Sequence, residues 1–197
     1  MRFTHIFENI AALALVVLSP LAITTATAQT IISNEALVTT NFIVSQKVAT
    51  AKCQSTGCSA KTSMFAAIPV TCPAATGQTC TFHIALDTKT SIVSGCGNCG
   101  GSGGTGFYQF LVDDAPPTIG PTTKDGNYLF EKFAYTAGLP KVATRQSYPA
   151  SVLTSVTNST SNIHTILVNV GCSDANHTGG CSAVAYWTTM RVDVFEP

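Results

Sequence analysis

Apolar and polar residues alternate with a period of two along most of the chain, which is typical of β-strands with one buried face. In residues 81–87, for example, Phe82, Ile84 and Leu86 alternate with polar or small residues. No apolar stripe at helical spacing is bounded by capping residues. The alternating segments predict eight strands, over residues 36–45, 63–72, 81–87, 106–113, 127–135, 148–157, 163–172 and 181–195.

The last two segments have the clearest alternation. We assign one face of each strand to its apolar residues: Ile166, Val168 and Val170 in the first, and Val184, Tyr186, Met190, Val192 and Val194 in the second. A polar turn containing glycine separates the segments, with Cys172 and Cys181 at its shoulders. We therefore predict a β-hairpin closed by a disulfide that contributes about 2.5–3 kcal/mol in the loop-entropy model.

Eight strands without a helix, an internal repeat or a shift in composition predict one all-β domain. The expected fold is a single antiparallel β-sandwich, eight-stranded and jelly-roll-like, with loops stapled by disulfides. Pro69 removes a backbone donor, so its segment is expected to be an edge strand or a bulged one. Apolar residues on both faces of residues 106–113 favour a central strand.

The first 28 residues have the features of a secretory signal peptide. Arg2 supplies a positive charge, residues 10–23 are apolar, and Ala26 and Ala28 form a small-residue cleavage site. Cleavage would leave residues 29–197 as one secreted or extracytoplasmic domain without stable membrane insertion, because no second apolar run follows. An uncleaved N-terminal anchor is the alternative.

All eight cysteines follow the expected cleavage site. An even number of cysteines in an exported chain favours disulfides, although sequence alone does not give their connectivity. Pairing between sequence neighbours is the simplest arrangement. It would join Cys53 to Cys58, Cys72 to Cys80, Cys96 to Cys99 and Cys172 to Cys181.

Charged residues are few and balanced, with 10 Lys and Arg against 10 Asp and Glu. A chain without a basic surface lacks the electrostatic means to hold nucleic acid, so we expect no nucleic-acid partner.

Two short motifs suggest catalysis but lack the required context. Cys96 and Cys99 have the spacing of a thioredoxin-like or zinc-binding pair, yet glycines surround them and no helix follows. Gly100–Gly104 matches the serine nucleophile elbow around Ser102, again without the helix that the motif needs. We expect a disulfide-closed loop in the first case and a chance match in the second.

The other titratable residues predict no catalytic, metal or cofactor site. His83, His164 and His177 lack close histidine neighbours, and we expect His83 and His164 to be exposed on the polar faces of their strands. Asp113 and Asp114 end a strand as a pair that could bind calcium, but without further acids nearby a solvated turn is the better interpretation.

Three aromatic or charged residues near the C-terminus form a candidate binding surface. Trp187, Arg191 and Phe195 fall on the face of the last strand opposite Val192, where they would either bind a sugar or partner chain or form a second buried face. Asn158 and Asn176 lie in N-x-S/T sequons in predicted turns and are candidate glycosylation sites in a glycosylating host.

Three segments carry a resemblance to a known family: residues 107–114, 163–170 and 189–195. They resemble the "F-x-x-L-V-D-G" strand and the "H-T-V-x-V-x … R-x-L-x-V-x" ending of bacterial secreted and tail-type β-sandwich domains shaped like the C1q/TNF jelly roll. The resemblance covers about three of the eight predicted strands. It implies a trimeric, non-enzymatic head, while the cysteine loops and Pro69 depart from the family pattern.

We therefore expect a secreted, disulfide-stabilised binding or structural module without catalytic activity, whose protein or glycan ligand is unknown and which forms a homo-oligomer. The alternative is a secreted carbohydrate-active enzyme or accessory carbohydrate-binding domain on the same fold. A thiol oxidoreductase using Cys96 and Cys99 is a weaker third hypothesis.

Overall fold

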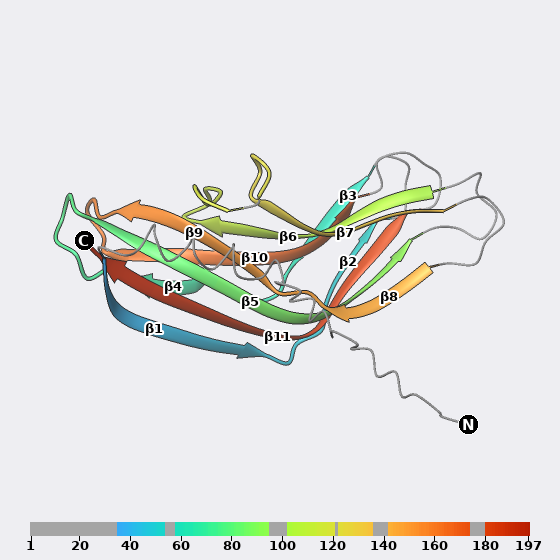
Figure 1. Cartoon of the computed structure of the whole chain (residues 1–197), viewed down its shortest axis with the longest axis horizontal. Helices are drawn as coiled ribbons and strands as arrows, with labels where there is room; N and C mark the ends of the chain where they lie inside the picture. The colour runs from blue at the N-terminus through green and yellow to red at the C-terminus, as the bar shows by residue number, and fades with distance from the viewer. Residues whose placement is uncertain (1–34, 54–57, 95–101, 121, 136–141, 174–179) are drawn as a thin grey trace, which may run out of the picture. The chain divides into compact units, whose positions relative to one another are not determined.

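The computed structural model describes residues 35–53, 58–94, 102–120, 122–135, 142–173 and 180–197, all within the compact unit Glu35–Pro197. These residues form two antiparallel sheets packed face to face, as the sequence predicts (Figure 1). Sheet A contains β1 (Ala36–Ser45), β2 (Ala49–Cys53), β5 (Thr79–Ser94), β8 (Val142–Ser147), β9 (Ala150–Thr157) and β11 (Cys181–Glu196). Sheet B contains β3 (Ser59–Ser63), β4 (Ile68–Thr71), β6 (Ser102–Val112), β7 (Asn127–Tyr135) and β10 (Ile163–Ser173).

The strand order is that of an eight-stranded jelly roll in which three strands are broken. β1 and β2 pair in succession with β11, β8 and β9 with β5, and β3 and β4 with β10. Counting each broken pair once gives β1/β2–β11–β5–β8/β9 in sheet A and β3/β4–β10–β6–β7 in sheet B. Apart from the breaks, the chain changes sheet at every connection except β6–β7. The predicted fold class is confirmed.

The predicted C-terminal hairpin is wrong, because β10 and β11 lie in different sheets. β10 pairs with β3, β4 and β6, whereas β11 pairs with β1, β2 and β5. Alternation identifies a strand with one buried face but does not say whether the next strand extends the same sheet or covers it. The disulfide between Cys172 and Cys181 therefore crosses the sandwich instead of closing a hairpin.

All three disulfides within the described residues connect sheet A to sheet B. Their Cα atoms are 5.8–6.1 Å apart, within the normal disulfide range. The bonds join Cys53 of β2 to Cys58 just before β3, Cys72 just after β4 to Cys80 of β5, and Cys172 of β10 to Cys181 of β11. Pairing between neighbours is thus confirmed for these pairs, whereas Cys96 and Cys99 lie outside the described residues.

The core fills the space between the inner faces of the two sheets. Phe82, Ile84 and Leu86 are buried there, as their alternation predicts. Tyr108 is also fully buried, and its hydroxyl lies 2.8 Å from Thr90 Oγ1. Burial raises the pKa of Tyr108 far above its ordinary value, so the ring remains neutral inside the sandwich. The same core includes Met64, Val70, Phe110, Val152, Ile166, Val168, Val170, Met190, Val192 and Val194.

A β-bulge changes which residues of β11 face the core. The pairing of β11 with β5 shifts between Ala185 and Trp187. Before the bulge the buried residues in the core-facing phase include Ala183 and Ala185, and after it they include Thr188, Met190, Val192 and Val194. Val184 and Tyr186, predicted to share a face with Met190, are therefore on the opposite side and only partly buried.

Candidate functional site

A chain of polar side chains lies on the outer face of sheet A. The imidazole of His83 on β5 places Nε2 2.7 Å from the hydroxyl of Ser151 on β9. Its Nδ1 lies 3.3 Å from Oδ2 of Asp193 on β11. These residues come from three adjacent strands, and the antiparallel register brings them together across the face.

Two further residues hold the carboxylate of Asp193. Thr40 on β1 donates its hydroxyl to Oδ1 at 2.8 Å, and Arg191 Nε lies 3.0 Å from Oδ2. Thr40, Asp193 and His83 occupy one row across three strands. The carboxylate is mostly buried beneath these contacts, whereas Arg191 and Ser151 remain exposed.

Ser151, His83 and Asp193 have the connectivity of a hydrolase triad: the hydroxyl meets Nε2 and the carboxylate meets Nδ1. Acyl transfer also needs donors aimed at the developing oxyanion. In a sheet, backbone N–H groups lie in the plane and pair with neighbouring strands, so the described strands β5, β9 and β11 direct their backbone donors along the sheet and not toward the Ser151 hydroxyl. The contacts satisfy the polar side chains and hold the Asp193 carboxylate between Thr40, His83 and Arg191.

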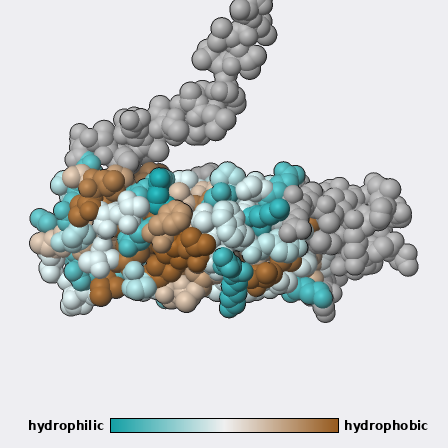
Figure 2. Space-filling model, turned by 90° about the horizontal axis from the view of Figure 1, so that it is seen from below, coloured by the Kyte–Doolittle hydropathy of each residue, from teal (hydrophilic) through white to brown (hydrophobic). Residues whose placement is uncertain are grey.

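Beside this network lies a group of exposed apolar side chains, which we call the apolar strip: Phe42, Val44, Val48 and Trp187. Phe42 is 67% exposed and is the register partner of Arg191, while Val44 pairs with Thr189, two residues from Trp187. Figure 2, seen from the side on which β1 lies in Figure 1, shows hydrophobic patches among polar side chains on this surface. A cluster of this kind is a typical binding surface.

The predicted binding surface of Trp187, Arg191 and Phe195 is divided by the structure. Trp187 is 45% exposed and sits at the bulge, where it joins the apolar strip. Arg191 is exposed but is engaged with Asp193. Phe195 is only 9% exposed, so of the two alternatives it fits a covered face. Phe42 and Val44 were missed, although the absence of charge along residues 36–45 is visible in the sequence.

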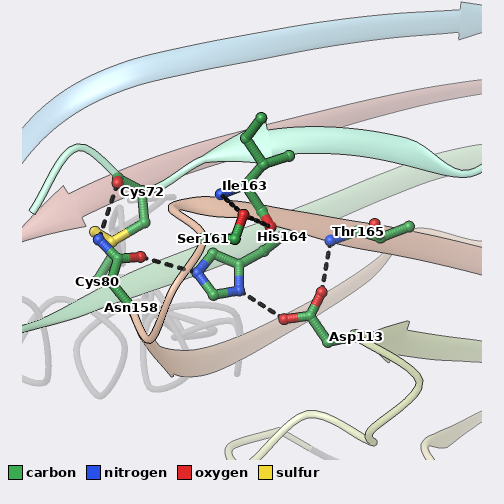
Figure 3. Close-up of polar contacts among 8 residues, drawn as sticks. All are labelled: Cys72, Cys80, Asp113, Asn158, Ser161, Ile163, His164 and Thr165. Carbon is green, nitrogen blue, oxygen red and sulfur yellow. Dashed lines mark hydrogen bonds and ion pairs between the residues drawn. A yellow bond between two sulfur atoms is a disulfide. The ribbon is translucent and has the colours of Figure 1, made fainter. Parts of the chain in front are cut away.

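A second polar network lies where β10 begins, with His164 and Asn158 buried and Asp113 partly exposed (Figure 3). His164 places Nδ1 2.6 Å from Asp113 Oδ2 and Nε2 3.1 Å from Asn158 Oδ1. Asp113 Oδ1 also accepts the backbone N–H of Thr165 at 2.7 Å. The Asn158 amide donates to the carbonyl oxygens of Cys72 and Ala74, which ties the network to the Cys72–Cys80 disulfide.

These contacts correct one expectation and bear on two others. His164 is buried, not exposed, because it shares the inward phase of Ile166. Asp113 and Asp114 lie in an exposed turn, in agreement with the predicted solvated turn, and the Asp113 carboxylate also contacts His164 and accepts the backbone N–H of Thr165. Asn158 is 3% exposed and its amide is engaged twice, an arrangement that disfavours a glycan there.

Several sequence-derived candidates fall outside the described residues. They are Asn176, His177, Cys96, Cys99 and the first two glycines of the Gly100–Gly104 segment. Ser102 is the first residue of β6 and is not followed by a helix. His83 is partly exposed, as expected, but it is hydrogen-bonded on both ring nitrogens.

Within the described ranges, no three His, Cys, Asp or Glu side chains are grouped so that they could hold a metal ion. The same part of the chain contains no helix that is both long enough and apolar enough to cross a membrane.

Comparisons with known proteins give no family for this chain. No protein-family model and no curated protein matches it. Among solved structures it is similar to that of the infectious bursal disease virus Gx strain, with 12% identity over 82% of this chain and 42% of that chain. The VP2 subviral particle of the same virus matches with 11% identity over the same shares. The TM-scores, 0.18 and 0.16, are too low for either likeness to support an argument.

Proposed function

We propose that this protein is a secreted, disulfide-stabilised β-sandwich that works by binding or assembly, without catalysis. The observation that carries the proposal is the apolar strip. Phe42, Val44, Val48 and Trp187 stay in contact with water although the sandwich has a well-filled core. Burying a large apolar side chain is worth about 1.5–3 kcal/mol, so covering this strip would supply substantial binding free energy.

The disulfides support the extracytoplasmic part of the proposal. Three cysteine pairs connect the sheets, and such bonds persist in oxidising compartments. The resemblance to C1q/TNF-like domains adds the expectation of a homo-oligomer.

The absence of catalysis is tested at Ser151, because its hydroxyl lies 2.7 Å from His83 Nε2, as a serine nucleophile would. We expect the purified, oxidised protein to remain unlabelled by a fluorophosphonate probe and to hydrolyse p-nitrophenyl esters no faster than its Ser151→Ala variant. The physical reason is that acyl transfer needs donors aimed at the oxyanion, whereas the backbone N–H groups of the described strands lie in the plane of the sheet. Stoichiometric labelling of Ser151, or turnover that disappears in Ser151→Ala and His83→Gln, would overturn the non-catalytic proposal.

A carbohydrate-binding module is the second candidate, favoured by the exposed ring of Trp187. Polar residues lie near Trp187 in the sheet register: Lys89 is its register partner, and Asp87 pairs with Thr189, two residues further along β11. An aromatic platform flanked by hydrogen-bonding groups suits a sugar ring. Trp187 is the chain's single tryptophan, so saturable quenching of its fluorescence by an oligosaccharide would support this candidate. Unchanged fluorescence across a glycan panel would remove it.

A further inference from the structure

β1 is a border strand whose outer edge has no partner within the described residues. It is the first strand of sheet A and pairs with β11 alone. Its 10 residues include no charged residue and no proline. A bulge between Leu37 and Thr39 interrupts its start, which leaves Thr39–Ser45 as a regular run. An uncharged, regular edge of this kind is a template for pairing with another strand.

The other border strands carry features that oppose such pairing. The edge of β9 is capped by Ile119, which exchanges two backbone hydrogen bonds with Leu153 at 2.9 and 3.0 Å. The remaining borders include a proline or charged residues in their sequences: Lys52 in β2, Lys61 in β3, Pro69 in β4, Glu131 and Lys132 in β7, and Arg145 in β8. These are the usual devices that block edge-to-edge association. β1 alone among these strands combines length with the absence of both devices.

We propose that a second copy of this chain pairs with β1, antiparallel and centred on Phe42. This inference rests on the proposed function as an assembly module and names its surface and partner. A two-fold axis at Phe42 would join two copies of sheet A edge to edge through an isologous contact. The run Thr39–Ser45 is symmetric about Phe42, so the register uses the whole regular part of the strand.

The side chains along this run are compatible with self-pairing. Phe42 would face its own copy, and aromatic pairs directly across two strands are favourable. Thr40 and Val44, which share its outer face, would face each other on both sides of the axis. No like charges would meet, because the run contains no charged residue. Pairing would also bring the two apolar strips together and cover the exposed rings of Phe42.

The test is the solution mass of the oxidised protein by light scattering on a sizing column. We expect the wild type to have twice the mass of one chain. Phe42→Lys and Phe42→Glu should each be monomeric, since each places like charges opposite one another at the axis. An equimolar mixture of these two variants should recover the dimer, because lysine then faces glutamate. Circular dichroism and thermal unfolding confirm that each monomeric variant is folded.

Leu129→Lys is the matched control, because Leu129 is an exposed apolar residue on β7, at the border of sheet B. It should leave the dimer unchanged. A wild-type monomer, a wild-type trimer, or mixed variants that stay monomeric would overturn the pairing. A wild-type monomer whose Ser151 is not labelled would overturn only the pairing, and the proposed non-catalytic binding function would stand. Turnover dependent on Ser151 would instead overturn the proposed function, whatever the mass.

Discussion

At the scale of single residues, two histidines on neighbouring layers of the sandwich have different environments. His83 lies on the outer face, between Ser151 and Asp193, while His164 lies inside, between Asp113 and Asn158. Each imidazole has a carboxylate oxygen at Nδ1 and the oxygen of an uncharged side chain at Nε2. The difference in burial follows from the position of each residue in its strand. His83 alternates with the buried Phe82 and Ile84 and so points outward, whereas His164 is in phase with the buried residues of β10.

Asn158 provides a prediction at this scale, because it is both a sequon and a buried network residue. Asn158→Gln should lower the free energy of unfolding by about 1–3 kcal/mol, since the carbonyl oxygens of Cys72 and Ala74 lose their donor. Thr160→Ala also removes the sequon but is exposed and leaves the Asn158 amide in place, so it should change stability by less than about 0.5 kcal/mol. Urea unfolding measures both.

Mass spectrometry of protein secreted from a glycosylating host completes this test. We expect Asn158 to be unmodified in the folded product. A glycan on Asn158 in folded protein, or equal stability of the two variants, would contradict the assignment of this side chain to the network.

At the scale of elements, the bulge in β11 determines where Trp187 is placed. An extra residue in β11 reverses the phase of everything before it, so small residues face the core and Val184 does not. Continuous alternation predicts that Val184 and Tyr186 share the buried face, which is why two of the five residues predicted there are wrong. Hydrophobicity alone does not mark a bulge, because Ala185 and Val184 are both apolar.

This phase assignment can be tested with one substitution on each side of the strand. Ala185→Asp should destabilise the protein by more than about 3 kcal/mol, because it places an unpaired carboxylate in the core. Val184→Asp should cost less than about 1 kcal/mol, because its side chain is on the outer face. The denaturant midpoints of the two variants measure this difference. If Val184→Asp were the more destabilising substitution, Val184 and not Ala185 would face the core, and the bulge assignment would be wrong.

At the scale of the whole molecule, the disulfides join layers instead of closing hairpins. Cys53 and Cys181 are register partners, so two inter-sheet bonds lie side by side, and Cys72–Cys80 makes a third link. Replacing Cys172 and Cys181 together by alanine should lower the free energy of unfolding by about 2.5–3 kcal/mol, as loop entropy predicts for a short loop. Guanidinium unfolding under oxidising conditions measures this, and an unchanged midpoint would show that the link adds nothing to the packed sheets.

The sequence by itself determined the fold class and most strand positions, and the simplest pairing of its cysteines proved correct for the three disulfides within the described residues. These follow from local properties: period-two alternation, turn residues and short separations between thiols. Only the tertiary structure decided that β10 and β11 face each other across the core, that Trp187 is exposed while Phe195 is covered, and that Ser151, His83 and Asp193 meet. These outcomes depend on strand order, register and a bulge. They are set by contacts between residues far apart in the chain, which local alternation does not encode.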